Sequence, residues 1–238
     1  QHRTAANNKE AFYQSIMAGM DMHMHGPEWQ NAVVELVREG RIPESRIDES
    51  VRRILTVKFR LGLFENPYGD AKTRDRVINN PEHKRTALEA SRNSIVLLKN
   101  ANNLLPLDEQ KYKKVLVTGI NANDQNIMGD WSELQPEEKV WTVLRGLKSV
   151  SPTTEFNFVD QGWDPRNMSQ AKVDEAVEAA KNSDLNIVCC GEYMMRFRWN
   201  DRTSGEDTDR DNLELVGLQE QLIRRLNETG KPTIVIII

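Results

Sequence analysis

The segment 192–212 concentrates charged and aromatic side chains directly after an apolar run. A carboxylic acid on a flexible arm, flanked by arginines and an aromatic ring, suits general acid catalysis on a sugar, where one carboxyl group protonates the leaving oxygen. On composition alone, a solvated charged loop is the more common explanation of such a segment. The side chains in question are Glu192, Arg196, Arg198, Trp199, Glu206 and Arg210.

A second candidate is Trp131, which ends the turn sequence Gly129-Asp130-Trp131. An exposed indole beside turn residues can stack on the CH groups of a sugar ring. A Trp that packs under its own loop fits the sequence equally well. Trp131 is therefore a candidate substrate-binding residue, with packing as the open alternative.

Two other chemistries have weaker support. Asp21, His23 and His25 would share one face of a strand, but no cysteine cluster or helical His spacing accompanies them, so packing or a pocket role is favoured over a metal site. The stretch VLVTGINAND has one glycine where a dinucleotide fingerprint needs three, and no phosphate-loop lysine follows. We expect no metal and no cofactor.

The elements that must position these residues alternate between strand and helix from residue 112 onward. Apolar runs predict strands at 115–119, 155–159, 185–191 and 233–238, and helical spacing predicts helices at 140–150, 169–182 and 215–230. Such alternation indicates a parallel sheet covered by helices, with functional groups in loops at the carboxyl ends of the strands. The two candidate loops, 120–138 and 192–212, both follow predicted strands.

The first 111 residues have a different pattern. We predict a helix over 8–16, a short strand over 18–24, a helix from Pro27 that Gly40 ends, and a helix after the weak capping box of Ser45 and Asp48. The last of these has one apolar stripe, which requires a partner surface; its residues are Ile47, Val51, Ile54, Leu55 and Phe59. Residues 67–111 predict a connector with a helix from Pro81 and a tucked loop at 104–107.

Composition restricts the class of protein. The 238 residues carry 32 basic and 36 acidic side chains, a net charge of −4, which gives no electrostatic footprint for nucleic acid. No apolar stretch approaches the roughly 20 residues of a membrane span. The adjacent Cys189 and Cys190 lie inside an apolar run, where a mutual disulfide would be strained, so we expect both to be buried and unpaired.

Both ends of the chain indicate an internal piece of a longer protein. The run 233–238 is a β-branched strand suited to burial on both faces, yet nothing follows it. The predicted strand at 18–24 has no earlier sheet to join. We therefore expect that the partners of this chain include further N- and C-terminal parts of the same protein.

Five segments, in their order along the chain, resemble the family 3 glycoside hydrolases, especially bacterial β-glucosidases. They are AGMDMHM, RIPESRIDESVRRILTVKFRLGLFENPY, the ALEASRNSIVLLKN and NLLPL pair, GDW and SGEDTDR. The resemblance covers nearly the whole chain. It implies the end of a (β/α)₈ barrel at 1–66, a linker at 67–111, and the first part of an α/β sandwich at 112–238.

The resemblance also implies a chemistry and its residues. Members are retaining exo-glycosidases, and Glu206 of the SGE sequence matches the acid/base position, whereas Glu192 is the weaker candidate and would order the loop. Trp131 matches a tryptophan on the acceptor side of the pocket. The nucleophile belongs to an Asp-Trp or Asp-Tyr motif upstream of AGMDM, which residues 1–17 lack. Asp130-Trp131 has the same spelling but lies after the linker and is not assigned that role.

We therefore predict a retaining β-glucosidase acting on oligosaccharides or glycosides, of which these residues supply the acid/base but not the nucleophile, so that they would be inactive alone. A β-xylosidase and a non-catalytic carbohydrate-binding module are the alternatives. The resemblance favours a periplasmic or secreted protein. A homodimer, the glycone and the preferred linkage stay open.

Overall fold

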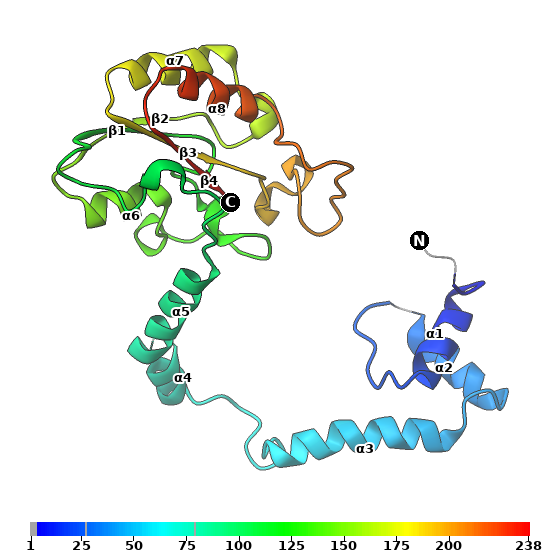
Figure 1. The fold of residues 1–238 in the computed structure, drawn as a ribbon. Coiled ribbons are helices and arrows are strands. Elements are labelled where there is room, and N and C mark those ends of the chain that lie inside the picture. Colours follow the sequence, from blue (N-terminus) through cyan, green and yellow to red (C-terminus); the bar gives the residue numbers. More distant parts are fainter. Residues whose placement is uncertain (1–3, 27, 79) are drawn as a thin grey trace. The chain divides into compact units, whose positions relative to one another are not determined.

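The computed structural model describes residues 4–26, 28–78 and 80–238, and it divides the chain into two compact units (Figure 1). The first unit is Gln1–Val96 and the second is Leu97–Ile238. Each unit is described by itself. Pro27, the predicted start of a helix, lies outside the described residues.

The second unit is built on a parallel sheet with the strand order β2-β1-β3-β4. The strands are β1 (Lys114–Thr118), β2 (Glu155–Val159), β3 (Leu185–Cys190) and β4 (Thr233–Ile237). Every pairing is parallel, and β1 aligns with β3 so that Val117 lies opposite Ile187. The predicted α/β fold with a parallel sheet is confirmed.

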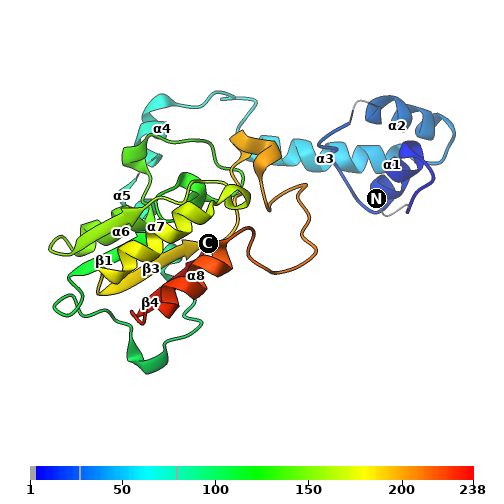
Figure 2. The same cartoon turned by 90° about the horizontal axis from the view of Figure 1, so that it is seen from above.

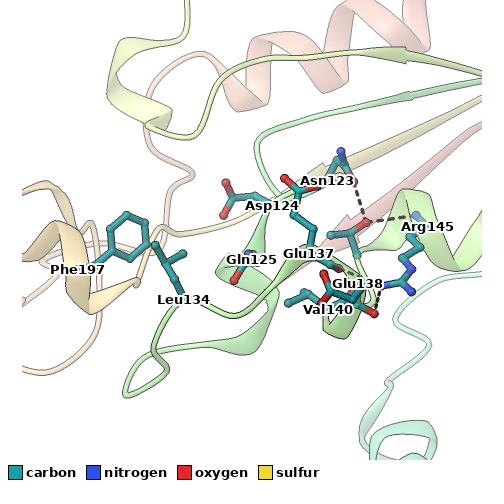
Figure 3. Close-up of a pocket in the computed structure, with 10 residues that line it drawn as sticks. Asn123, Asp124, Gln125, Leu134, Glu137, Glu138, Val140, Arg145 and Phe197 are labelled. Carbon is teal, nitrogen blue, oxygen red and sulfur yellow. Dashed lines mark hydrogen bonds between the residues drawn. The ribbon is translucent and has the colours of Figure 1, made fainter.

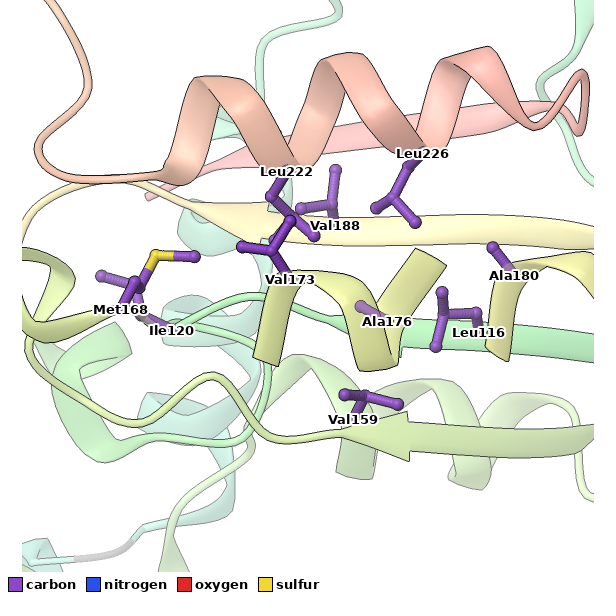
Figure 4. Close-up of a cluster of buried hydrophobic side chains, with 10 residues drawn as sticks. All are labelled: Leu116, Ile120, Val159, Met168, Val173, Ala176, Ala180, Val188, Leu222 and Leu226. Carbon is purple, nitrogen blue, oxygen red and sulfur yellow. The ribbon is translucent and has the colours of Figure 1, made fainter. Parts of the chain in front are cut away.

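Helices cover both faces of this sheet. Helices α7 (Gln170–Lys181) and α8 (Gln219–Glu228) lie side by side along the strands on one face (Figure 2). Their side chains form a buried cluster with the strands, in which Leu222 and Leu226 of α8 face Val188 of β3 (Figure 4). The opposite face packs against α6 (Val143–Val150), whose Leu144 is buried there. Because β3 is buried along its whole length, it is a central strand of the sheet.

The crossovers from β1 and β3 diverge at the middle of the sheet. The chain leaves β1 for α6 on one face, whereas it leaves β3 for α8 on the other face. Since β1 and β3 are neighbours, their carboxyl ends flank a topological switch point, where open α/β sheets commonly bind ligands. The two candidate loops start at these two strand ends.

Two helices of this unit begin later than the sequence predicts. Helix α6 starts at Val143 because Thr142 is its N-cap, accepting the backbone N–H of Arg145 at 3.2 Å. Helix α8 starts at Gln219, after a turn at Gly217. The strand boundaries agree with the predictions to within one residue.

The predicted tucked loop at 104–107 packs against the core. Leu104 and Leu107 contact the buried cluster on the α6 face of the sheet. The amide of Asn100 fixes the turn, because it donates to the carbonyl of Leu105 and accepts its N–H at 2.8 and 2.9 Å. The short helix η1 (Ala101–Asn103) precedes it.

Five α-helices make up the described part of the first unit: α1 (Asn8–Met17), α2 (Trp29–Arg38), α3 (Glu44–Arg60), α4 (Ala71–Val77) and α5 (Pro81–Ser94). A small core joins α1, α2 and the start of α3 through Ile16, Leu36 and Ile42. The apolar stripe of α3 is largely exposed within the unit; Phe59, for example, is 62% exposed. At the start of the helix, Ile47 of the stripe packs against the small core.

The predicted strand at 18–24 is wrong, since the described residues of the first unit contain no strand. Its backbone has no neighbouring strand to pair with, and a side chain satisfies it instead. Arg46 donates to the carbonyls of Ile16 and Met20 and to the carboxylate of Asp21. Met24 is 97% exposed. A strand pattern without a ladder partner does not become a strand.

The predicted capping box of Ser45 and Asp48 is also wrong. Helix α3 begins at Glu44, with Pro43 as its N-cap and no side-chain cap. The buried Ile42 anchors the preceding turn, where its N–H bonds to the carbonyl of Leu36 at 3.2 Å. Tertiary anchoring therefore places the helix start ahead of the local capping signal.

Both cysteines are buried and free, as predicted. Burial raises the pKa of Cys189 to about 12 and the pKa of Cys190 to about 11. Thiols held protonated in this way are poor nucleophiles, so the pair acts as packing.

Candidate active site

The loop that carries Glu206 begins at the end of β3, and its root is defined as residues 191–194. Buried side chains bind the backbone of these four successive residues. Gln219 accepts the N–H of Gly191 and donates to its carbonyl, both at 2.9 Å. Thr203 binds the backbone N–H and C=O of Tyr193 at 2.8 Å. Such satisfied polar contacts fix the direction in which the loop leaves the sheet.

Asn126 joins this root to the loop that follows β1. Its amide oxygen accepts the N–H of Met194 at 2.8 Å, and its amide nitrogen donates to the carbonyl of Glu192 at 2.6 Å and to Asn121 at 2.8 Å. Asn126 is fully buried. The loops after β1 and β3 are therefore one hydrogen-bonded structure at the switch point.

The Asn126 contacts carry a testable consequence. We expect Asn126→Ala to lower the free energy of unfolding by about 1–3 kcal/mol, because it leaves buried backbone groups unpaired. Hydrogen exchange at residues 191–195 should accelerate, and urea unfolding measures the stability. The control is Asn123→Ala on the same loop, where the side chain is exposed and accepts one bond from Thr142. Equal behaviour of the two variants would contradict this role.

Asp130 connects the two sequence-predicted site residues. Its Oδ1 accepts the backbone N–H of Trp131 at 2.8 Å, and its Oδ2 accepts the backbone N–H of Glu206 at 2.9 Å. Arg196 Nε lies 3.0 Å from Oδ1, and Arg202 Nη1 lies 3.6 Å from Oδ2. The N–H of Glu206, then that of Trp131 and the two arginines, lower the pKa of Asp130 against the opposing effect of desolvation. The structure thus brings Trp131 and Glu206 together.

Arg196 lies between the same two residues. Its guanidinium stacks on the Trp131 ring, 3.4 Å from Cζ to the ring centroid, and forms an ion pair with the carboxylate of Glu206. A planar guanidinium can make both contacts at once. The Glu206 side chain remains 49% exposed and Trp131 is 72% exposed, so both can reach a ligand.

The backbone at Trp131 is left-handed, with φ of 60°. A residue of this size rarely adopts that region, and the cost is about 1–3 kcal/mol. The Asp130 carboxylate holds the conformation through the N–H of Trp131. The alternative that Trp131 packs under its own loop does not match its exposure.

Glu192 is placed differently from Glu206. Its Oε1 pairs with Arg210 at 2.7 Å, and its side chain is 25% exposed. Its other oxygen, Oε2, is buried without a hydrogen-bond partner. The contact with Arg210 joins the two ends of the 192–212 segment, which fits an ordering role.

The remaining arginines of the segment are packed instead of solvated. The Arg202 side chain is 1% exposed, stacks on Trp199 at 3.7 Å, and donates to the carbonyl of Glu206 at 2.7 Å. Arg198 stacks on Trp163 at 3.7 Å. The sequence reasoning missed Asp130, Asn126 and Arg202. The interleaving of arginines with aromatic residues was the available signal, since such pairs stack.

A hollow of about 550 Å³ opens beside this cluster, lined by the start of α6, the loop after β1, and Phe197 (Figure 3). Arg145 closes one side, where its Nη1 donates to the carbonyls of Glu137, Glu138 and Val140. Phe197 and Leu134 lie together at the other side. Neither Glu206 nor Trp131 lines this hollow. The two candidate site residues therefore lie in the exposed cluster and not in the lining of this hollow.

Of the histidine pair considered for a metal, His23 has packing contacts, whereas His25 is exposed. His23 stacks on Trp29 with ring centroids 4.5 Å apart and meets Phe12 edge-on. The carboxylate of Asp21 accepts hydrogen bonds from Arg46, Arg53 and Ser50. Within 4–26, 28–78 and 80–238, no group of three or more metal-ligating side chains is close enough to hold an ion. No helix in those ranges has the length and hydropathy needed to cross a bilayer.

Comparison with known families gives matches over both units. Residues 95–238 match the C-terminal domain of glycosyl hydrolase family 3, and residues 2–57 match the N-terminal domain of the same family. The two matched ranges follow one another in the order expected from the sequence.

Individual relatives agree with these matches. The chain is 34% identical to a β-xylosidase of Formosa agariphila and 31% identical to a periplasmic β-glucosidase of Salmonella typhimurium. Both matches cover the whole of this chain. A solved β-glucosidase of intestinal bacteria, involved in saponin metabolism, matches 98% of the chain with a TM-score of 0.81 and 32% identity. The chain spans about a third of the length of each: 34%, 33% and 35%.

Proposed function

The chain belongs to glycosyl hydrolase family 3, and from this premise we propose that it is part of a retaining, exo-acting β-glucosidase. The substrates are terminal β-D-glucosyl residues of oligosaccharides or glycosides. Glu206 is the acid/base, and Trp131 is the platform on the acceptor side. The nucleophilic carboxylate comes from a segment outside residues 1–238.

The observation that carries the proposal is the juxtaposition of Glu206 and Trp131. They come from different loops, yet one carboxylate binds both of their backbone N–H groups. An exposed acid beside an exposed indole, at a topological switch point, suits protonation of a glycosidic oxygen whose leaving group stacks on the ring. Arg196 pairs with the Glu206 carboxyl group and orients it beside the indole, and in its ionised form this group would activate water in the second step of a retaining reaction.

A β-xylosidase is the second candidate, and the Formosa relative supports it. The two glycones differ by the hydroxymethyl group of glucose. The remaining organisation also stays a proposal: a barrel end at 1–66, a linker at 67–111 and a sandwich at 112–238. The periplasmic relative supports a periplasmic or secreted location.

The test is hydrolysis of 4-nitrophenyl β-D-glucoside and β-D-xyloside by the full-length protein, with the anomer of the first product followed by NMR. We expect β-glucose to appear first, because double displacement retains the configuration. A higher kcat/KM for the xyloside would replace the glucosidase by the xylosidase. Binding of glucosides without hydrolysis would replace both by a carbohydrate-binding module, and an α-anomeric first product would exclude the retaining mechanism.

A further inference from the structure

We propose that Asp130 is a positioning residue. It holds the 192–212 segment, which carries Glu206 and is called the arm below, against the 120–138 loop, which carries Trp131. The acid and the platform are then placed as one unit. This inference rests on the proposed function for its catalytic consequence. The fastening itself is a statement about the two loops and is tested separately.

The contacts of Asp130 support this role. Glu206 and Asp130 are 76 residues apart in the chain, and the bond from the Glu206 N–H to Oδ2 is a direct link between the distal part of the arm and the other loop. The Asp130 side chain is only 15% exposed and faces two arginines of the same arm, Arg196 and Arg202. A carboxylate surrounded by two N–H donors and two guanidinium groups is strongly held in its ionised form.

Gly205 provides a second observation at the same place. Its φ is +106°, and a Cβ built on it would lie 2.8 Å from Asp130 Oδ2 and 3.3 Å from Arg202 Nη1. A side chain at position 205 would displace the Asp130 carboxylate from the peptide between 205 and 206, and the positive φ also favours glycine there. The glycine of the SGE sequence thus serves the contact to Asp130.

Arg196 adds the connection between side chains. It pairs with Asp130 and with Glu206 while it covers one face of Trp131. Release of the Asp130 contacts would remove the acceptor of the Glu206 N–H and leave the Glu206 backbone held only at its carbonyl, by Arg202, so that its carboxyl group would change position. A displacement of about 1 Å at a reacting group can cost on the order of 100-fold in rate.

The experiment compares Asp130→Ala and Asp130→Asn with wild type in the full-length protein. With aryl β-glucosides of poor leaving phenols, we expect Asp130→Ala to lower kcat/KM by about 10- to 100-fold. With 2,4-dinitrophenyl β-glucoside, whose dinitrophenolate leaves without protonation, the loss in kcat/KM should be several times smaller. Asp130→Asn keeps one acceptor oxygen and should show an intermediate loss.

The matched control is Asp184→Ala at the opposite end of the sheet. Asp184 also accepts two backbone N–H groups, from Lys113 and Lys114 at 3.0 and 2.8 Å, and these bonds likewise lower its pKa. It does not contact the arm. We expect a similar effect on stability without any change in the dependence on the leaving group.

A second readout does not require glycosidase activity. Trypsin should cleave after the arginines at 196–210 at least about ten times faster in Asp130→Ala, because arm anchoring limits local opening. Gly205→Ala should have the same effect with Asp130 intact, which covers a failure of Asp130→Ala to fold. Unchanged cleavage in both variants, or an equal loss for both leaving groups, would overturn the proposal. If the wild-type protein did not hydrolyse glycosides but both variants were cleaved faster than wild type, only the proposed function would be contradicted.

Discussion

Replacing Glu206 with Gln is expected to lower kcat/KM of the full-length enzyme by about 10²- to 10⁴-fold on glucosides with poor leaving groups. The amide is nearly isosteric with the carboxyl group but cannot donate the proton that the leaving oxygen needs. For 2,4-dinitrophenyl β-glucoside the first step should be almost unaffected. The measurement is kcat/KM across a series of aryl glucosides ordered by the pKa of the leaving phenol.

The second step of the reaction gives an independent signature of the same residue. In a retaining enzyme the acid becomes the base that activates water. Glu206→Gln should therefore accumulate the glycosyl-enzyme with the dinitrophenyl substrate. Azide, which needs no deprotonation, should restore turnover and yield β-glucosyl azide. A residue that only ordered the loop would show neither rescue nor this product.

Glu192→Gln is the matched control for this prediction, since it changes the other carboxyl group of the arm. Glu192 is paired with Arg210 and lies at the end of β3, so we expect a loss that is similar for every leaving group. Azide should have no effect. If azide rescue and a leaving-group-dependent loss appeared in Glu192→Gln and not in Glu206→Gln, the assignment of the acid/base would pass to Glu192.

The sheet of the second unit could be predicted because its strands are buried on both faces. Leu185–Cys190 is buried throughout, and such a run can be read from residue type alone. The start of helix α3 could not be predicted in this way. Its first turn competes with a local capping signal, and the burial of Ile42 decides the outcome. Local patterns thus gave way where a distant contact was stronger.

The candidate site shows the same division. Glu206 and Trp131 have side chains whose chemistry is evident in the sequence, so both could be named. The residues that bring them together act through backbone N–H groups, as Asp130 does, or are buried charges, as Arg202 is. A side chain bound to a backbone group 76 positions away leaves no pattern in the sequence. A buried arginine also contradicts the ordinary expectation of a solvated charge.

A large effect on stability is expected at Gly119, where the loop of Trp131 leaves β1. Its φ is +101°, and a Cβ added there would lie 2.0 Å from the carbonyl oxygen of Cys189 and 2.8 Å from its backbone nitrogen. The obstacle is the backbone of β3 and not a movable side chain, so β1 and β3 would have to separate. The same region holds the bond from the Asn121 N–H to the Cys189 carbonyl at 3.3 Å.

We therefore expect Gly119→Ala to lower the free energy of unfolding by more than about 4 kcal/mol, a range reserved for severe core disruption. Equilibrium urea unfolding measures it, and the soluble yield does so if the variant does not fold. The control is Gly146→Ala in α6, where φ is ordinary and no atom lies within 4 Å of the added Cβ. That change should stabilise the helix by about 0.5–1 kcal/mol, so the same substitution takes opposite signs at the two sites.

The contradicting outcome is a Gly119→Ala protein whose free energy of unfolding lies within about 1 kcal/mol of the wild-type value, as for a surface substitution. It would show that β1 and β3 can separate at little cost. The close contact at the switch point would then not be what holds the two loops in place.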